Sequence, residues 1–247
     1  MGRAARAKLK KLGAWNPTCI IQARMGSTRL PGKVMMYLSG KPMLERVIAR
    51  VREADELKQI VVATSELEQD DPIEELCDFL GVDWFRGSEP DVLNRYYEAA
   101  EHFDADPIVR VTADCPLIDA SVLNQLVRLY HDNVGAFVAN NLEPSFPLGL
   151  DAEVFSFAML KQATQQLGDD YDAEHVTQWM RRQPGAVNLK LGTDLSHYRI
   201  TVDTRDDMTL MRAIYRAYGS LPYVTVKDAL ELIDRRPELA KLAGVAA

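Results

Sequence analysis

The sequence has no long hydrophobic run and only three cysteines. No apolar stretch approaches the ~20 residues needed to cross a bilayer, so we expect a soluble protein without membrane insertion. Cys19, Cys77 and Cys115 form no C-x-x-C pair and are not at zinc-ligand spacing. Each lies in an apolar stretch, which predicts buried, reduced thiols and fits a cytoplasmic protein.

Basic residues are outnumbered by acidic ones, 29 to 36. The 247 residues carry a net charge of -7, which argues against a nucleic-acid partner. Hydrophobic residues make up 47% of the chain, enough for one large α/β domain or two small ones. The exception is the start, where the first dozen residues hold five basic side chains and no acidic one. This stretch lacks the apolar segment of a secretory signal, and we treat residues 1–17 as a basic N-terminal extension.

Short segments rich in Val and Ile alternate with amphipathic ones. The former predict strands at residues 18–23, 59–65, 82–87 and 107–114. Apolar residues at helical spacing predict helices at residues 44–51, 73–80 and 123–130. Asp71 and Pro72 fit the N-cap and the first turn of the second helix. The strands are apolar throughout, so both faces should be covered, and the predicted fold class is α/β with a mostly parallel central sheet and helices on both faces.

After about residue 140 the alternation loosens. We expect a strand leading into a helix, a second helix, two strands and a late helix, at residues 151–166, 172–182, 187–191, 198–203 and 211–218 respectively. No composition shift marks a linker. Residues 18–247 are therefore interpreted as a single domain with an elaborated second half.

A basic loop follows the first predicted strand. Its sequence, QARMGSTRLPGK, spans residues 22–33 and carries Arg24, Arg29 and Lys33. Ligands of open α/β sheets bind at the carboxyl ends of the strands, where this loop begins. Glycine lets backbone N–H groups approach an anion closely, and Arg and Lys add positive charge. A phosphate chain is one candidate ligand, and an ordinary solvated surface loop is the alternative.

The loop differs from two familiar phosphate-binding loops. Five residues separate Gly26 from Gly32, and Val34 follows Lys33, so neither the spacing nor the hydroxyl of a Walker A loop is present. The chain also lacks the G-x-G-x-x-G fingerprint of dinucleotide-binding folds.

Two carboxylates follow apolar strand segments. Asp114 ends IVRVTAD and Asp203 ends YRITVD, so both should project into the cleft that the basic loop borders. Each alone fits a helix N-cap equally well. Asp119 and Asp206 fit that capping role better, because helical patterns begin directly after them.

The basic loop resembles the signature loop of the cytidylyltransferases that form nucleotide sugars. The resemblance is greatest to the subgroup called spore-coat polysaccharide biosynthesis proteins F, and extends to the 3-deoxy-manno-octulosonate and acylneuraminate cytidylyltransferases. It continues in the expected order over roughly residues 18–218, through KPMLERVI, IVVATS, FRGSEPDVLNRYYEAA, VRVTADCPLID, GLDAEVFSF, EHVT and TVDTRDD.

This resemblance implies a nucleotide-diphospho-sugar transferase fold, which is glycosyltransferase-A-like. It also implies CTP as donor, Mg²⁺ as cofactor, pyrophosphate as product and a small acidic acceptor, such as a sugar acid for surface glycan biosynthesis. A homodimer is expected from the same likeness. The segment at about 140–190 is interpreted as an elaboration for the acceptor site and for dimerisation.

The resemblance also assigns site residues. Arg24, Lys33, Asp114 and Asp203 are the implied catalytic residues, and the last two would hold Mg²⁺, which needs few protein oxygens because it keeps several waters. The implied nucleotide-binding residues are Gln22, Ala23, Arg24, Ser27, Thr28, Arg29, Lys33, Ser88, Asp91 and Arg95.

An acceptor pocket is expected beside the helix predicted at residues 172–182. Glu174 and Gln178 are four positions apart and would share one helix face, with His175 next to them. A histidine without a ligand role remains the alternative for His175. Arg199 precedes the second carboxylate and is predicted to meet an acidic acceptor.

One motif departs from the sugar-acid enzymes. They usually carry a GDxP element where this chain reads TADCP, so the acceptor remains open. The alternative function is a glycosyltransferase that uses a preformed nucleotide sugar. Such enzymes usually carry D-x-D at the end of a strand, whereas the tight match here, Asp104-Ala-Asp106, precedes its strand. A nucleotide-binding protein without catalysis would be expected to have a damaged site, and the loop and both carboxylates look intact.

Overall fold

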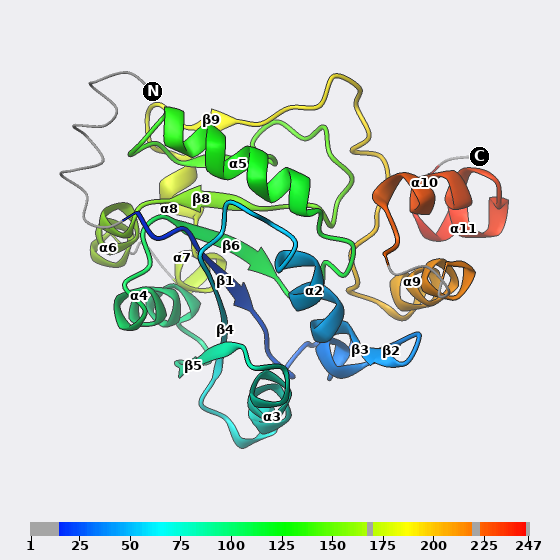
Figure 1. Cartoon of the computed structure of the whole chain (residues 1–247), viewed down its shortest axis with the longest axis horizontal. Helices are drawn as coiled ribbons and strands as arrows, with labels where there is room; N and C mark the ends of the chain where they lie inside the picture. Colours follow the sequence, from blue (N-terminus) through cyan, green and yellow to red (C-terminus); the bar gives the residue numbers. More distant parts are fainter. Residues whose placement is uncertain (1–14, 167–169, 219–222, 246–247) are drawn as a thin grey trace.

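A computed structural model describes residues 15–166, 170–218 and 223–245 (Figure 1). The predicted basic extension lies outside the described residues, except for its last three positions. The strands are β1 (Thr18–Gln22), β2 (Tyr37–Leu38), β3 (Lys41–Pro42), β4 (Gln59–Ser65), β5 (Asp83–Gly87), β6 (Ile108–Thr112), β7 (Val138–Ala139), β8 (Glu153–Phe155) and β9 (Val187–Asn188).

Seven strands form the main sheet in the order β5-β4-β1-β6-β8-β7-β9, and β2 and β3 form a separate hairpin. The four strands from β5 to β6 are parallel, whereas β8 is antiparallel to both β6 and β7. The sheet is therefore mostly parallel, as predicted. Because β1 and β6 are parallel neighbours, the loops after them meet at one edge of the sheet.

Helices cover both faces of this sheet (Figure 1). They are η1 (Lys33–Met35), α2 (Met43–Val51), η2 (Glu68–Asp70), α3 (Asp71–Leu80), α4 (Val92–His102), α5 (Ala120–Asp132), α6 (Phe157–Gln165), α7 (Asp170–His175), α8 (Gln178–Arg181), α9 (Arg205–Ala217), α10 (Val226–Asp234) and α11 (Pro237–Leu242). Within the described ranges, no helix has the length and apolar character that crossing a membrane requires.

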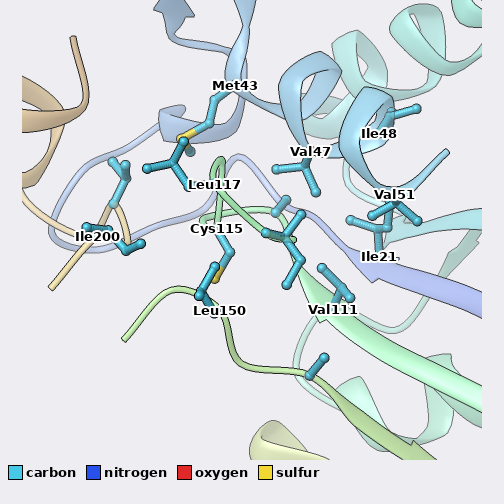
Figure 2. Packing of buried hydrophobic residues seen from close by; sticks show 14 of the residues in the cluster. Ile21, Met43, Val47, Ile48, Val51, Val111, Cys115, Leu117, Leu150 and Ile200 are labelled. Carbon is cyan, nitrogen blue, oxygen red and sulfur yellow. The ribbon is translucent and has the colours of Figure 1, made fainter. Parts of the chain in front are cut away.

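The two faces of the sheet bury two separate hydrophobic clusters. Cys19 and Ile21 of β1 belong to the larger cluster with α2, α3, α5 and α9. The intervening residue, Ile20, belongs to the cluster with α4, α6 and α8 on the other face. Figure 2 shows part of the larger cluster, including Val47 of α2 and Val111 of β6. Alternate side chains of one strand are thus covered on opposite faces, which is why the strands read as continuously apolar.

The cysteines and the Asp119 cap follow the prediction. All three cysteines are free and buried. Asp91 caps α4 by accepting a hydrogen bond from the backbone N–H of Asn94, and Asp119 caps α5 in the same way through Ser121. These caps satisfy backbone donors that the first helical turn leaves unpaired.

Two other predicted caps were wrong. α3 begins at Asp71, so Asp70 occupies the N-cap position, and its carboxylate is not used for capping. Thr204, and not Asp206, caps α9. The hydroxyl of Thr204 accepts from the backbone N–H of Asp207, whose side chain accepts in return from the N-cap backbone. This reciprocal capping box has the Thr-x-x-acid spacing, and it places the helix start two residues earlier than expected.

The prediction of a strand at residues 198–203 was wrong, because this segment does not join a β-sheet. In this segment Arg199 forms only an isolated bridge, with Leu148. The backbone N–H of Ile200 donates to Leu148, and that of Val202 donates to Asp114 at the end of β6. The segment satisfies its backbone by pairing with loops, and this pairing brings Asp203 to the edge of the sheet where Asp114 lies.

The helix predicted at residues 172–182 is broken. Val176 has a left-handed backbone with φ 57, and it separates α7 from α8. A β-branched residue rarely adopts this conformation, so no local pattern indicated the break. Glu174 and Gln178 therefore lie on different helices and do not share a face as expected. The predicted strand at residues 187–191 is shortened to β9.

Candidate functional site

A cavity of about 340 Å³ opens at the carboxyl ends of β1 and β6. The end of β1, the basic loop, the end of β6, the last turn of α7 and Asp203, two residues before the start of α9, all contribute side chains. Its lining residues are Gln22, Arg24, Ser27, Thr28, Arg29, Lys33, Val34, Arg110, Thr112, Ala113, Asp114, Glu174, His175 and Asp203. Most of the predicted catalytic and phosphate-binding residues thus meet in one place.

The ammonium of Lys33 lies between the two predicted metal carboxylates. Its Nζ is 2.9 Å from Asp114 Oδ2, 2.9 Å from Asp203 Oδ1 and 2.9 Å from the carbonyl oxygen of Val202. Burial alone would lower the pKa of Lys33, but its contacts with Asp114 and Asp203 raise it. Lys33 therefore stays charged and holds two carboxylates together that would otherwise repel each other.

Asp203 is surrounded by three cations. Besides Lys33, it pairs with Arg29 at 3.1 Å and with Arg199 at 2.8 Å. Burial acts to raise the pKa of Asp203, but the bonds from Lys33 and Arg199 outweigh it and hold this pKa below its usual range. Asp203 is ionised and caps no helix, so the capping alternative for it is excluded.

Asp114 also has a role other than capping. Its Oδ1 accepts a hydrogen bond of 2.6 Å from Thr112 Oγ1, and its Oδ2 accepts from Lys33. Thr112 is the last residue of β6, so the side chain of Asp114 is fixed at the strand end. Both carboxylates are held by ordered donors and face one cavity.

The carboxylate pair fits Mg²⁺ by its chemistry. Among the described residues, no group of three or more His, Cys, Asp or Glu side chains could hold a metal. Mg²⁺ does not require one, because it is held by one or two carboxylates together with waters and phosphate oxygens. Asp114 and Asp203 supply hard oxygens, provided that the ammonium of Lys33 moves from between them.

Arg24 links the two sides of the cavity. Its Nη1 lies 2.8 Å from Glu89 Oε1, and its Nη2 lies 3.3 Å from Glu174 Oε1 on α7. Together with the pairs of Arg29 and Lys33, every predicted phosphate-binding cation of the loop contacts an acidic side chain. A phosphate ligand would have to replace these internal partners with its own oxygens.

The backbone of the basic loop is fixed by Met25 and Asp70. The carboxylate of Asp70 is fully buried and accepts a 2.7 Å hydrogen bond from the backbone N–H of Met25. The carbonyl of Met25 accepts from the backbone N–H groups of Ser27 and Gly32. This role of Asp70 was not predicted, because a carboxylate just before a helix is typical of an ordinary cap.

Four predicted nucleotide-binding residues lie outside the cavity lining. Arg95 is fully buried, and its Nη1 donates to the carbonyl of Ser88. Ser88 Oγ accepts from the backbone N–H of Asp91, which caps α4. These residues shape the start of α4, and a contact of theirs with a cytosine or ribose stays a prediction. Ala23 is buried below the loop.

The predicted acceptor residues divide into two groups. Glu174 and His175 line the cavity, whereas Gln178 lies beyond the break on α8 and is not part of the lining. Arg199 is also absent from the lining and makes ion pairs with Asp203 and Asp207. Arg199 therefore supports the second carboxylate in this structure.

Two charged residues on neighbouring strands were missed. Arg110 of β6 lines the cavity, and its Nη1 lies 2.9 Å from Glu153 Oε2 on β8. Glu153 also pairs with Arg181 at 2.7 Å. A charge inside an otherwise apolar strand is the signal that could have identified both, because such a charge is buried only with a partner.

The Asp104-Ala-Asp106 element lies at the opposite end of β6. It precedes the first residue of the strand, and Asp106 Oδ1 accepts a hydrogen bond from the backbone N–H of Phe157. The cavity is at the other end, beyond Thr112. The arrangement that a nucleotide-sugar-dependent glycosyltransferase usually shows is therefore not formed by these two carboxylates.

Comparison with known proteins agrees with this geometry. A family model described as cytidylyltransferase matches residues 18–227. The chain is 34% identical over 234 residues to the spore coat polysaccharide biosynthesis protein SpsF of Bacillus subtilis, covering 90% of this chain and 95% of that protein. It is 36% identical over 119 residues to a 3-deoxy-manno-octulosonate cytidylyltransferase of Trichlorobacter lovleyi, covering 47% of this chain and 45% of that protein.

Solved structures show the same fold. A cytidylyltransferase from Leptospira borgpetersenii superposes with a TM-score of 0.87 at 30% identity, covering 95% of this chain and 99% of that one. CMP:2-keto-3-deoxy-manno-octonic acid synthetase, solved in complex with CTP, superposes with a TM-score of 0.63 at 17% identity, covering 82% of this chain and 99% of that one. The predicted nucleotide-diphospho-sugar transferase fold is confirmed.

Proposed function

The chain belongs to the cytidylyltransferase family, and from this we propose that it transfers CMP from CTP to a small acidic acceptor. An oxygen of the acceptor attacks the α-phosphorus of CTP, the bond to the β-phosphate oxygen breaks, and pyrophosphate leaves. The observation that carries the proposal is the convergence of Arg24, Arg29 and Lys33 with Asp114 and Asp203 on one cavity. Family membership supplies the donor and the reaction class.

The basic loop performs the charge stabilisation in this proposal. Phosphoryl and nucleotidyl transfer need little covalent chemistry from the protein, which mainly positions the groups and offsets negative charge. Arg24 and Arg29 are partly exposed in ion pairs that weaken readily in water, so phosphate oxygens can replace their carboxylate partners. Ser27 and Thr28 add hydroxyl donors beside the same phosphates.

We propose Asp114 and Asp203 as the residues that hold Mg²⁺. When bound, this ion neutralises phosphate charge and orients the phosphate oxygens. With the ion bound, Lys33 would leave the two carboxylates and face the phosphates, where its ammonium would supply a point charge. Calorimetry tests the exchange: Mg²⁺ alone should bind weakly while Lys33 occupies the carboxylates, and Mg²⁺ with CTP should bind tightly.

The SpsF relative supports a role in surface polysaccharide biosynthesis. CTP as a substrate and three free thiols fit a cytoplasmic enzyme. Dimerisation through the segment at about 140–190 stays a prediction. Analytical ultracentrifugation of the purified chain tests whether it forms a dimer.

A thermal-shift screen with Mg²⁺ and CTP, UTP, ATP, GTP or a UDP-sugar tests the donor. A ligand that binds only the folded state stabilises it by ~2.7 kcal/mol at a hundredfold excess over its dissociation constant. We expect CTP to raise the melting temperature most, followed by CTP-dependent release of pyrophosphate with an acidic acceptor. A shift with the UDP-sugar and none with CTP would favour the glycosyltransferase alternative.

A further inference from the structure

Arg110 places a positive charge in the middle of β6, on the wall of the cavity. Its side chain is 17% exposed, and Glu153 lies directly opposite it in the antiparallel pairing of β6 with β8. Nη1 donates to Glu153 Oε2 at 2.9 Å, and Nη2 donates to Gln22 Oε1 over a longer distance of 3.3 Å. A guanidinium has five N–H donors, and these two contacts leave most of them unused.

The Nε of Arg110 is one of the unused donors. This atom is buried and has no hydrogen-bond partner in the part of the chain that the structure describes. Buried polar atoms are almost always paired in folded proteins, so each exception needs an explanation. Arg110 belongs to the cavity lining, but its Nε is closed off from water. A ligand in the cavity would therefore pair with this atom only if the guanidinium turned toward it.

Glu153 does not fully neutralise Arg110. This carboxylate is 3% exposed and is shared with Arg181, whose Nη1 lies 2.7 Å from Oε1. Arg181 is held further by the side-chain oxygen and the carbonyl of Asn141. One carboxylate thus serves two guanidiniums, and of the two only Arg110 lines the cavity.

The other arginines and lysines of the cavity lining already have a role in the proposed function. Arg24, Arg29 and Lys33 belong to the basic loop and would contact the triphosphate. Arg199, the cation predicted for the acceptor, is bound to Asp203 and Asp207 and does not line the cavity. Arg110 is therefore the guanidinium of the described lining that remains for an acidic acceptor.

The position of Arg110 suits this second substrate. β6 and β8 lie on one side of β1, whereas β4 and β5 lie on the other. Ser88 and Arg95, the predicted base contacts, follow β5. Asp114 lies four residues beyond Arg110 in the chain. Burial is the largest effect on the pKa of the Arg110 guanidinium and lowers it, whereas Glu153 and, to a smaller extent, Asp114 raise it. A ligand on Arg110 is thus close to the proposed metal carboxylates.

We propose that Arg110 binds the carboxylate of the acceptor and thereby selects acidic acceptors. The proposal rests on the proposed function, whose acceptor it describes more closely. A planar guanidinium matches a carboxylate by two parallel N–H···O bonds, which an ester or amide of the same shape cannot form equally well. Arg110 acts as a specificity-determining residue and takes no part in the transfer itself.

A direct test observes the Nε–H of Arg110 by NMR. Pyruvate serves as a small carboxylate probe and pyruvamide as its neutral counterpart, added to the CTP-loaded protein with Mg²⁺. The resonance is assigned by its loss in Arg110→Lys. We expect a saturable shift with pyruvate and none with pyruvamide or with sodium chloride at the same ionic strength. An Nε–H that does not respond to pyruvate, or responds equally to chloride, overturns the proposal.

Turnover gives a second test. With 3-deoxy-manno-octulosonate, its methyl ester and other sugar acids as acceptors, Arg110→Gln should lower kcat/KM for an acid about tenfold to a hundredfold. The ester should change little, so that the preference for the acid disappears. A loss that is equal for acid and ester overturns the assignment to the carboxylate.

Arg181→Gln is the matched control. It removes a partner of the same Glu153 without changing the cavity lining, so it should lower stability while the preference for the acid remains. Loss of the preference in this variant contradicts a specific role of Arg110. Calorimetric titration with CTP is run on every variant, and failure of the wild type to bind CTP refutes the proposed function independently of the Arg110 resonance.

Discussion

Lys33 Nζ lies 2.9 Å from Asp203 Oδ1, although 170 positions separate the two residues in the chain. The same ammonium contacts Asp114, which lies two residues beyond the end of β6. One lysine thus joins three of the segments that form the candidate site: the basic loop, the end of β6 and the segment before α9. Because its side chain is only 11% exposed, its removal leaves two partly buried carboxylates without their shared counterion.

Asp114→Asn and Asp203→Asn should each abolish pyrophosphate release while the fold persists. Asn keeps the size of the side chain and removes the charge that the proposed metal and Lys33 require. Circular dichroism and thermal melting check the fold. Asp119→Asn is the control, because Asn replaces Asp well as an N-cap and Asp119 does not line the cavity. Normal turnover in either site variant would remove that carboxylate from the mechanism.

Asp70→Asn should loosen the basic loop. The buried carboxylate accepts hydrogen bonds from the backbone N–H groups of Met25 and Ser65, and an amide group would turn an N–H toward one of these donors. We expect a stability loss of about 2 kcal/mol and several-fold weaker CTP binding. Urea unfolding and calorimetry measure the two effects.

Asp71→Asn is the control for Asp70. Asp71 is the next residue along the chain, but its side chain is half exposed and pairs with Arg86. The control should leave CTP affinity unchanged and alter stability by less than ~1 kcal/mol. Equal loss of CTP affinity in both variants would refute a specific role of Asp70 in holding the loop.

Gly149→Ala should be strongly destabilising. Gly149 has φ +113, and a Cβ at this position would lie 2.7 Å from the backbone carbon of Ile200 and 2.7 Å from the backbone nitrogen of Thr201. The close approach lets the segment before Asp203 pair with Leu148. Left-handed strain and overpacking together predict a loss of about 3 kcal/mol or more.

Gly135→Ala separates the steric effect from the conformational one. Gly135 also has a positive φ, +90, but open space surrounds the position of its Cβ. The change should cost about 1–2 kcal/mol through backbone strain alone. Similar losses in the two variants, measured by urea unfolding, would show that contact with Ile200 and Thr201 is unimportant.

Local sequence signals predicted much of the fold. The apolar strands, the amphipathic helices and the basic loop each depend on residues that are close in the chain, and the structure contains them at the expected places. Asp114 was identified for the same reason, because it directly follows an apolar strand. The sheet with helices on both faces then follows from the alternation of these elements.

The parts that were missed depend on distant partners. The segment 198–203 pairs with loops that include Leu148, and no local pattern distinguishes such pairing from a sheet ladder. Arg110 bonds to Glu153, which is 43 positions away, so the role of each becomes visible only when β6 and β8 are side by side. The break at Val176 is held by tertiary contacts against the backbone preference of a β-branched residue.

Asp151 should make stability depend on pH. Burial raises the pKa of Asp151 to about 6, and the nearby charge of Glu153 acts in the same direction, from an ordinary value of 3.8. The folded state therefore holds this proton more tightly than the unfolded chain does. Its contribution to stability is fully present below the ordinary pKa and is lost as the pH rises through about 6.

Asp151→Asn removes this titration. The variant should gain roughly 1–3 kcal/mol of stability relative to the wild type between about pH 4 and pH 7, because the amide cannot ionise. Urea unfolding of both proteins across this range measures the difference. Asp132→Asn is the control, since the side chain of Asp132 is 80% exposed and its charge stays in water. If the two stability curves of Asp151→Asn and wild type run parallel, Asp151 does not carry a proton into the folded state, and its carboxylate is ionised beside Glu153 throughout.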